Sequence, residues 1–288
     1  MSRRGDESGM ILVNVLMFVA IAAGLVLLMI NREELALDRG LRTREAARAL
    51  AIVRGGELSA LVALRRDGQI GPESDHAGEP WAKLSERATP IEGGSFTLAI
   101  ADAEGRFNVN SLRSGEAAAI ILFQTIATEV GLKPEQILAA AEYVRREGPL
   151  ADLRPLRLAG IDPKVAERLE RLVTALPGTT ALNLNAADQE MLRILFRDPV
   201  IAARLTEVRG RQGYLTLKDL SDQRVTMPWG TSFRSNTFWV RTRATVGGTS
   251  QQGATLIQRR TTPDGMVEAV PVERWRGAAV PPGAPALP

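Results

Sequence analysis

An uninterrupted apolar run near the amino terminus constrains this chain more than any other feature of its sequence. Residues 10–30 carry no charge, and Asn14 is their one polar side chain. A helix needs about 20 apolar residues to span a bilayer, whereas the apolar core of a secretory signal usually has about 7–15. The run continues directly into a charged, helix-forming segment. We therefore predict a membrane-spanning helix, residues 10–30, that extends without a cleavage site into a soluble helix.

A short polar leader, residues 1–9, precedes the run and ends in Gly9, so that the apolar residues begin at Met10. This order resembles the type IV prepilin signal, in which a membrane protease, the prepilin peptidase, cuts on the cytoplasmic side after the glycine. The resemblance implies cleavage between Gly9 and Met10, with the apolar helix kept on the mature protein. Arg3 and Arg4 agree with a cytoplasmic leader, because cytoplasmic segments carry an excess of positive charge. A plain single-pass anchor remains the alternative.

Asn14 would be the fifth residue of the mature chain. Most pilin-like subunits carry a glutamate at that position, and in a pilus it is thought to pair with the amino terminus of a neighbouring subunit. A carboxylate in hydrocarbon is costly unless it is paired, and Asn14 carries no charge to pair. The hypothesis is a subunit at a filament tip, with no neighbour beyond it. The simpler alternative is a polar residue near the membrane interface.

The composition argues against several enzyme classes. The 288 residues include no Cys and one His, which excludes disulfides, thiol nucleophiles and Cys-based zinc sites and leaves little for a catalytic triad. The 36 basic and 33 acidic residues give a formal charge of +3. This near balance does not indicate a basic nucleic-acid surface. No GxSxG, HExxH or P-loop spacing occurs, so we expect a protein without enzymatic activity.

The soluble half of the long helix, from residue 31 to about residue 66, is amphipathic. We expect its apolar positions to pack against the helices of partner subunits. These positions are Leu50, Val53, Leu58 and Leu61. Gly55 and Gly56 weaken the middle of this stretch and indicate a kink or break there.

The remaining residues change period along the chain. Residues 67–94 are rich in Gly, Pro and acidic residues and are typical of a loop, in which His76 is expected to be solvated. Residues 95–101 resemble a strand, residues 113–225 are predominantly helical, and alternation after residue 237 predicts an antiparallel meander. Residues 277–288 hold four prolines and are predicted to be disordered.

The predicted fold class is α+β, with a long amino-terminal helix packed on an antiparallel sheet and a large all-α insertion that resembles helix-hairpin-helix modules. The chain then divides into five parts. They are a leader, 1–9; a transmembrane half-helix, 10–30; a pilin-like domain, 31–112 and 226–276; a helical insertion, 113–225; and a tail, 277–288.

Several stretches together resemble one family, the general secretion pathway protein K family, GspK, whose members are minor pseudopilins of type II secretion. The first is the leader and helix SGMILVNVL. Others are EPWAKL near Trp81, ADAEGRFNVNSL at 101–112, TALPGTTALNLNAADQEML at 174–192 and FRSNTFWVRTRATVG near the carboxy terminus. The absence of a glutamate at Asn14 fits the same family.

The resemblance implies a place at the tip of a short periplasmic pseudopilus, anchored in the bacterial inner membrane. It implies as partners the minor pseudopilins GspI and GspJ, and it implies no chemistry. Some members bind calcium, which needs about six to eight oxygen ligands. Glu142, Glu147 and Asp152 are too sparse to predict such a site, and we expect no other metal or cofactor. The Asn108–Asn110 and Asn183–Asn185 pairs are expected to be turn and helix-cap residues.

Two other functions are considered. Residues 182–220 resemble the helix-hairpin-helix module of membrane-anchored DNA receptors. Such a module needs a glycine-rich hairpin whose amides approach phosphate, whereas here Asp198 would repel phosphate and Pro199 lacks an amide donor. We therefore expect no nucleic-acid partner. A minor pilin of a type IV pilus shares the leader and the fold, although the large insertion favours a GspK-like protein.

Overall fold

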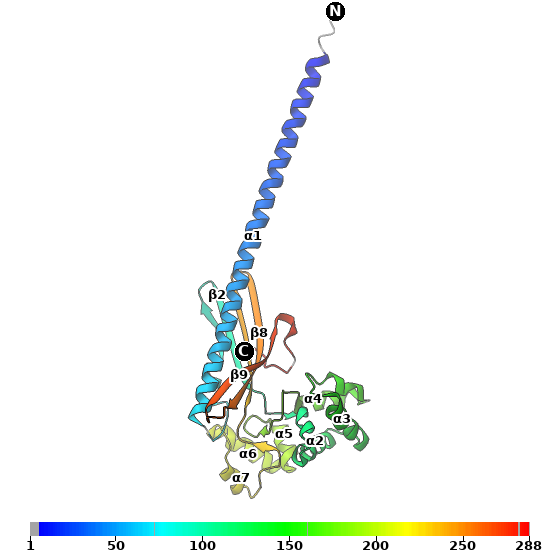
Figure 1. Ribbon diagram of the computed structural model, residues 1–288, viewed down its shortest axis with the longest axis vertical. Coiled ribbons are helices and arrows are strands. Elements are labelled where there is room, and N and C mark those ends of the chain that lie inside the picture. Colours follow the sequence, from blue (N-terminus) through cyan, green and yellow to red (C-terminus); the bar gives the residue numbers. More distant parts are fainter. Residues whose placement is uncertain (1–5, 72, 160, 282, 288) are drawn as a thin grey trace, which may run out of the picture.

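The computed structural model describes residues 6–71, 73–159, 161–281 and 283–287. Its dominant element is α1 (Asp6–Ile70), a helix of 65 residues that is roughly 100 Å long at about 1.5 Å per residue. The amino-terminal half of α1 projects away from the rest of the molecule, and its other half lies along the sheet (Figure 1). The molecule is therefore a long stalk with a folded part at one end.

The predicted kink or break at Gly55 and Gly56 is wrong, because α1 is continuous through both glycines. Gly56 is buried, and a Cβ added to it would lie 2.6 Å from the Phe96 ring. The missing side chain therefore lets the helix approach the sheet closely. Intrinsic propensity does not detect this role, because it treats each glycine as a destabilising residue.

The sheet has five strands in the order β1-β2-β7-β8-β9, and all neighbours are antiparallel. The strands are β1 (Glu86–Ile91), β2 (Gly94–Asp102), β7 (Thr237–Val246), β8 (Thr249–Thr261) and β9 (Val267–Arg276). The helix α1 packs across β7 and β8. Strands β2 and β7 are hydrogen-bonded neighbours although a long helical region separates them in sequence.

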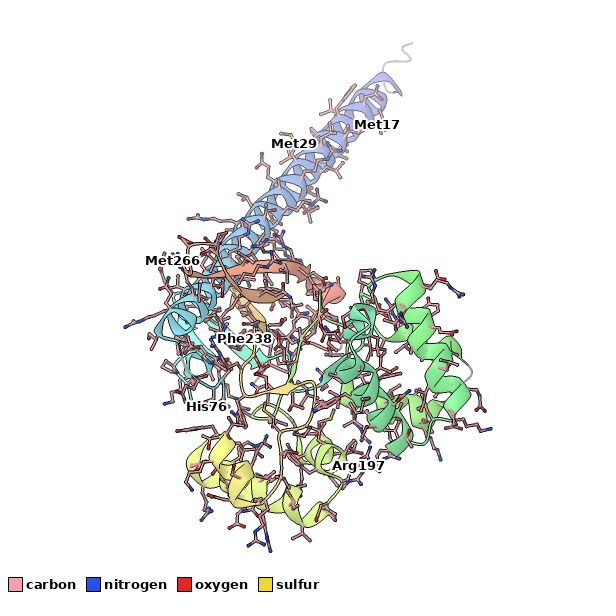
Figure 2. The ribbon with its side chains drawn as sticks, turned by 60° about the horizontal axis from the view of Figure 1, so that its bottom comes forward. Met17, Met29, His76, Arg197, Phe238 and Met266 are labelled. Atoms are coloured by element: carbon pink, nitrogen blue, oxygen red, sulfur yellow. The ribbon has the colours of Figure 1, made fainter. Side chains whose placement is uncertain are left out.

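The core between α1 and the sheet is built from small and branched side chains on one face of the helix. Ala49, Ala60 and Leu64 are fully buried there. Trp81 and Phe238 meet edge to face beneath them, with ring centroids 5.0 Å apart. Figure 2 shows Phe238 inside the folded part of the molecule. Small residues at this spacing bring the helix axis close to the sheet.

The helical region follows β2, and its described residues form six α-helices, short 3-10 turns and four two-residue strands. The helices are α2 (Ala117–Glu129), α3 (Pro134–Glu147), α4 (Pro163–Leu172), α5 (Gln189–Phe196), α6 (Pro199–Gln212) and α7 (Leu217–Asp222). The strands are β3 (Phe107–Asn108), β4 (Val173–Thr174), β5 (Leu182–Asn183) and β6 (Thr231–Ser232). The 3-10 turns of the chain are η1 (Ala82–Leu84), η2 (Val109–Ser114), η3 (Arg154–Ala159) and η4 (Gly277–Ala279).

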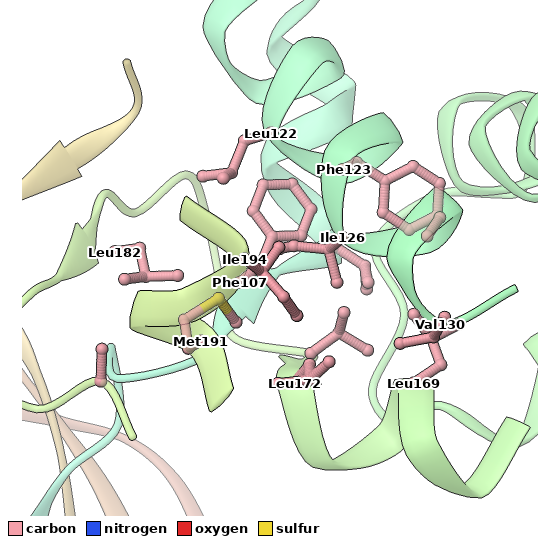
Figure 3. Close-up of a cluster of buried hydrophobic side chains, with 14 of the residues drawn as sticks. Phe107, Leu122, Phe123, Ile126, Val130, Leu169, Leu172, Leu182, Met191 and Ile194 are labelled. Atoms are coloured by element: carbon pink, nitrogen blue, oxygen red, sulfur yellow. The ribbon is translucent and has the colours of Figure 1, made fainter. Parts of the chain in front are cut away.

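This helical region has an apolar core of its own (Figure 3). Phe107 and Phe123 stack at its centre with ring centroids 5.9 Å apart. The region extends to β6, which pairs with β5, and so ends a few residues beyond the predicted boundary at residue 225. A two-residue strand has too few alternating positions to be recognised in sequence. The α+β fold with a long helix, an antiparallel sheet and a helical insertion is confirmed.

The carboxy-terminal tail differs from the predicted disorder. Its described residues, 277–281 and 283–287, lie against the sheet and include the turn η4. Ala284 is 8% exposed, and the carbonyls of Gly283 and Pro285 accept hydrogen bonds from Arg106 and Arg241. A proline-rich composition does not predict these partners, because they lie far away in the sequence. Proline also restricts the free chain, so that less entropy is lost when the tail is ordered.

Candidate functional site

The amino-terminal half of α1 has the properties of a membrane anchor. It belongs to the one helix, among the described residues, that is long and apolar enough to cross a membrane. Every residue from Leu12 to Ile30 is exposed, including Asn14. An apolar surface of this extent is not expected in contact with water. Gly9 and Met10 lie within the bounds of α1, and the structure does not describe the exposure of either residue.

The four residues predicted to contact partner helices divide between two faces of α1. Val53 is 7% exposed and packs with Ala244 and Val246 of the sheet. Leu61 is half-buried and packs against the apolar cluster that contains Trp81 and Phe238. Leu50 is half-buried at the helix edge, whereas Leu58 is 60% exposed. Val53 and Leu61 thus pack within this chain, a role that differs from the predicted one. An amphipathic pattern cannot distinguish a helix face that packs on its own sheet from one that packs on another chain.

A second line of small and apolar residues, the outer stripe, is exposed along α1. The outer stripe consists of Leu37, Leu41, Ala51, Gly55, Leu58 and Val62. Ala51, Gly55, Leu58 and Val62 follow one another at steps of four, three and four residues, which places them on one helix face. Leu37 and Leu41 lie on the same face, with Arg44 and Arg48 between them and Ala51. Leu58 and Val62 are 60% and 67% exposed, and a Cβ added to Gly55 would meet no atom within 4 Å. The outer stripe is therefore shaped to pack against another helix.

A buried ionic cluster joins the lower end of α1 to the sheet. Arg259 of β8 donates to Asp67 of α1 at 2.8 Å and also to Asp75 in the following loop. The side chains of Arg259, Asp67 and Asp75 are 3%, 10% and 0% exposed. The guanidinium also donates to the carbonyl of Ser235 and lies 4.6 Å from the centre of the Phe238 ring. Three segments distant in sequence are thereby held at one point.

The helical region is attached at the same place. We call this place the junction, and it consists of Asp67, Asp75, Asp102, Asn183, Ser235 and Arg259. The amide of Asn183 donates to the Asp75 carbonyl at 3.0 Å, to Asp102 at 2.8 Å and to the Ser235 hydroxyl at 2.9 Å. The Ser235 hydroxyl in turn donates to the carboxylate of Asp102. Asp102 ends β2 and Asn183 lies in β5, so the junction fastens the helical region to the sheet.

Two buried carboxyls, Asp102 of the junction and Glu104 two residues after it, have raised pKa values. Burial raises the pKa of Asp102 to about 6, although hydrogen bonds from Ser235 and Asn183 oppose the shift. Burial raises the pKa of Glu104 to about 8. Its Oε1 is buried with no hydrogen-bond partner among the described residues. Glu104 is therefore expected to be largely protonated at neutral pH.

The raised pKa of Glu104 predicts a pH-dependent stability. Between about pH 4.5 and pH 8 the folded chain holds a proton on Glu104 that the unfolded chain releases, so stability falls as pH rises through this window. The slope from one such group approaches about 1.4 kcal/mol per pH unit. Glu104→Gln should flatten the decline, as measured by urea unfolding at pH 5 and pH 8. The exposed Glu142→Gln is the control and should leave the slope unchanged; equal slopes in all three proteins would contradict the prediction.

The two asparagine pairs act in turns and caps, as predicted, and they also bridge distant segments. Asn108 caps η2 and accepts from the Asn110 amide. The Asn110 side chain bonds backbone groups of Leu150 and Leu176. Asn183 accepts from the Asn185 amide. Asp188, rather than Asn185, caps α5 by accepting from the Met191 amide. Asn185 accepts from the Leu215 amide at 2.6 Å.

The hairpin between α5 and α6 does not present free amides to a phosphate. Arg197 ends α5 in the left-handed conformation, with φ of 53°. Asp198 then accepts from the amides of Val200 and Ile201 at 2.8 and 3.2 Å. A carboxylate therefore occupies the donors that a DNA-binding hairpin would offer. Arg197 is exposed, and Figure 2 shows it among the helices of the helical region.

The acidic residues considered for calcium are exposed or paired with arginines. Glu142 is exposed, Glu147 pairs with Arg146, and Asp152 pairs with Arg154. In the described part of the chain, the carboxylates close enough to hold a metal belong to Asp67, Asp75 and Glu79. Arg259 bonds the first two, and Glu79 accepts from Trp81 and from the His76 amide. A guanidinium among so few oxygens does not fit a calcium ion, which needs about six to eight.

His76 differs from the solvated loop residue that the sequence predicts. It is half-buried and stacks on Tyr214 of the helical region, with ring centroids 4.6 Å apart. Burial lowers its pKa, while the charges of Asp75 and Asp67 oppose the shift. The neighbouring residues Arg259, Asp67 and Asp75 were not singled out from the sequence, because isolated charges in amphipathic segments resemble solvent-exposed ones. His76 lies beside the junction, near the helical region (Figure 2).

Comparisons with known proteins agree with this architecture. No protein-family profile matches the chain. The type II secretion system protein K of Pseudomonas aeruginosa is 28% identical over 257 residues, which cover 76% of this chain and 77% of that protein. A similar fold occurs in the crystal structure of the GspK-GspI-GspJ complex of the type 2 secretion system of enterotoxigenic Escherichia coli. That match has a TM-score of 0.60 and 21% identity, and it covers 83% of this chain and 99% of the other.

The long helix, the five-stranded antiparallel sheet and the helical insertion give the chain the fold seen in the solved GspK-GspI-GspJ complex, with an amino-terminal helix long and apolar enough to span a membrane. The resemblance to the GspK family that the sequence motifs indicate is confirmed by the sequence relative and by the shared fold. The chain is thus a relative of type II secretion system protein K.

Proposed function

We propose that this chain is a minor pseudopilin at the tip of the pseudopilus of a type II secretion machine. Its anchor would lie in the bacterial inner membrane and its folded part in the periplasm. The observation that carries the proposal is the large helical region inserted between β2 and β7 of a pilin-like sheet, which the GspK fold shares. The relative in Pseudomonas aeruginosa is a component of the same kind of machine.

The shape of the molecule supports a terminal position. The helical region lies at the opposite end of the molecule from the amino-terminal half of α1 (Figure 1). In a filament whose subunits align their long helices, this bulk would lie above the last layer and exclude a further subunit. Asn14 supports the same position, since it lacks the charge that would pair with the amino terminus of a neighbour. The role is structural and needs no chemistry.

The outer stripe supports packing against the long helices of GspI-like and GspJ-like subunits, which are the partners in the solved complex. Its residues are exposed in the isolated chain, whereas Val53 and Leu61 pack internally. The spacing of three and four residues between Ala51, Gly55, Leu58 and Val62 allows close approach of a second helix. Gly55 would give the neighbouring helix room near the centre of the contact.

A test of this function is co-purification with the GspI-like and GspJ-like subunits of the same organism. The double substitution Leu58→Glu and Val62→Glu places two charges in the contact and should reduce recovery of both partners at least ten-fold. Leu138→Glu is the matched control, because Leu138 is 60% exposed on α3. Undiminished recovery with the double variant would contradict the proposed packing, and no recovery with the unmodified chain would contradict the proposed function.

Cleavage after Gly9 by a prepilin peptidase is a separate prediction. In cells that contain an active peptidase, mass spectrometry should find a mature chain that begins at Met10. Gly9→Ala should leave nearly all of the chain as precursor, because the side chain would stand beside the bond to be cut. Gly5→Ala, the same change elsewhere in the leader, should be processed normally. A chain that keeps Met1 in such cells would exclude this processing.

A minor pilin of a type IV pilus is the second candidate, since it would share the leader and the anchor. The insertion between β2 and β7 favours the pseudopilin, because the solved GspK fold contains it. Deletion of the gene would distinguish the two, since loss of protein secretion with surface pili intact supports the pseudopilin.

A further inference from the structure

A pocket of about 770 Å³ lies on the side of the sheet that faces the helical region. Its sheet wall includes Trp239 and Trp275, whose ring centroids are 5.2 Å apart. Residues 151–154 and 173–175 form the wall on the helical side, and tail residues 278–281 close another side. This volume lies within the usual range of ligand pockets, about 300–1,000 Å³. The pocket shares no residue with the outer stripe or the junction.

The pocket and its surroundings hold several hydrogen-bond donors, and one donor of the lining, on Trp239, lacks an acceptor among the described residues. Trp239 is 5% exposed, and its indole Nε1 is buried with no hydrogen-bond partner in the described part of the chain. Nε of Arg241, two residues further along β7 and outside the pocket lining, also has no hydrogen-bond partner among those residues. Arg106 lines the pocket from the segment that follows β2, and burial lowers its pKa. A ligand that suits these groups offers carbonyl oxygens.

The tail already supplies two such oxygens. Arg106 donates to the Gly283 carbonyl at 3.2 Å, and Arg241 donates to the Pro285 carbonyl at 2.8 Å. Between them, Ala284 is buried in an apolar cluster that contains Trp239 and other side chains of the sheet. Aromatic grooves with a few donors bind proline-rich segments elsewhere, since such segments are extended in advance and keep their carbonyls exposed. The tail therefore has the form of a peptide bound in such a groove.

We propose that this pocket is a binding groove for an extended, proline-rich peptide segment of a partner protein, and that the described tail residues, 277–281 and 283–287, close it in the isolated subunit. The tail occupies one side of the groove and leaves the indole Nε1 of Trp239 without an acceptor. A partner segment would displace the tail and bond this donor as well. The groove thus adds a regulated interaction surface that is independent of helix packing along α1.

The experiment compares the full chain with a chain that ends at Arg276, both purified in detergent. The probe is a fluorescein-labelled peptide with the sequence of residues 277–288, followed by fluorescence anisotropy. The shortened chain should bind the peptide, and the full chain should bind it at least ten-fold more weakly, because a tethered copy competes at a high effective concentration. In the shortened chain, Trp239→Phe should weaken binding several-fold, whereas Trp229→Phe, which changes an exposed tryptophan that does not line the pocket, should not.

A second variant decides the outcome if the shortened chain is unfolded by circular dichroism. Ala284→Asp in the full chain buries a charge in the tail alone and should expel it, so that the peptide binds as it does to the shortened chain. A peptide with glycine in place of each proline should bind more weakly to both. The proposal is overturned if neither variant binds the peptide at 1 mM, a concentration on the order of the tethered one, or if the full chain binds it equally well.

Discussion

Arg259→Met should lower the free energy of unfolding by about 3–5 kcal/mol, the usual cost of removing one partner from a buried ion pair. The substitution leaves the carboxylates of Asp67 and Asp75 buried without their cation. It also removes the bond to the Ser235 carbonyl, which connects the same arginine to the segment before β7. Urea unfolding followed by tryptophan fluorescence measures the effect.

The adjacent Arg260→Met is the matched control, because Arg260 is exposed and bonds the side chain of Gln258. It should change the stability by less than about 0.5 kcal/mol. Adding Asp67→Asn and Asp75→Asn to Arg259→Met should recover part of the loss, because the buried charges are then removed together. If Arg259→Met and Arg260→Met were equally stable, the ionic cluster would not hold α1 to the sheet.

Gly105→Ala should destabilise the protein by about 1–3 kcal/mol, the range for overpacking a well-filled site. A Cβ at this position would lie 2.4 Å from the carbonyl oxygen of Ala186, which is a backbone atom and cannot rotate away. The next residue back, Glu104, accepts from the Asn183 amide at 2.8 Å, so a shift here would strain the junction. The measurement is the midpoint of thermal unfolding of the variant.

Gly210→Ala makes the same chemical change in α6, where an added Cβ would meet no atom within 4 Å. Alanine is favoured over glycine inside a helix by about 0.5–1 kcal/mol, so this control should be neutral or slightly stabilising. A loss of stability at both positions would show that glycine-to-alanine changes are poorly tolerated throughout the helical region. A loss at neither would mean that the segment after β2 adjusts without cost.

The fold was largely predictable from the sequence because its elements carry strong periodic signals. The apolar run of residues 10–30, the helices of the insertion and the alternation in β7 each follow a period that reports local structure. The kink predicted at Gly56 was wrong because the role of that glycine depends on Phe96, which lies in another element. The order of the tail was missed for the same reason, since Arg106 and Arg241 hold it from distant strands.

The candidate sites were less predictable than the fold. Amphipathicity identified α1 as a packing surface, yet it could not separate Val53, which faces the chain's own sheet, from Leu58, which is exposed. The junction left no pattern at all, because Asp67, Asp75 and Arg259 are single charges spread along the chain. The family motif at residues 101–112 did identify a structurally important segment, since Asn110 in it bonds the backbone of Leu150 and Leu176.

The attachment of the helical region has a mechanical consequence. The chain leaves the sheet from β2 and returns through β7, which are hydrogen-bonded neighbours, so two covalent connections stand side by side. Asn183 bonds Asp102 at the end of β2, and Arg259 bonds Asp67 near the carboxy-terminal end of α1. The connection between the helical region and α1 is therefore rigid, and a force along α1 is transmitted directly to the helical region. Rotation of the helical region relative to α1 would require these buried bonds to break first.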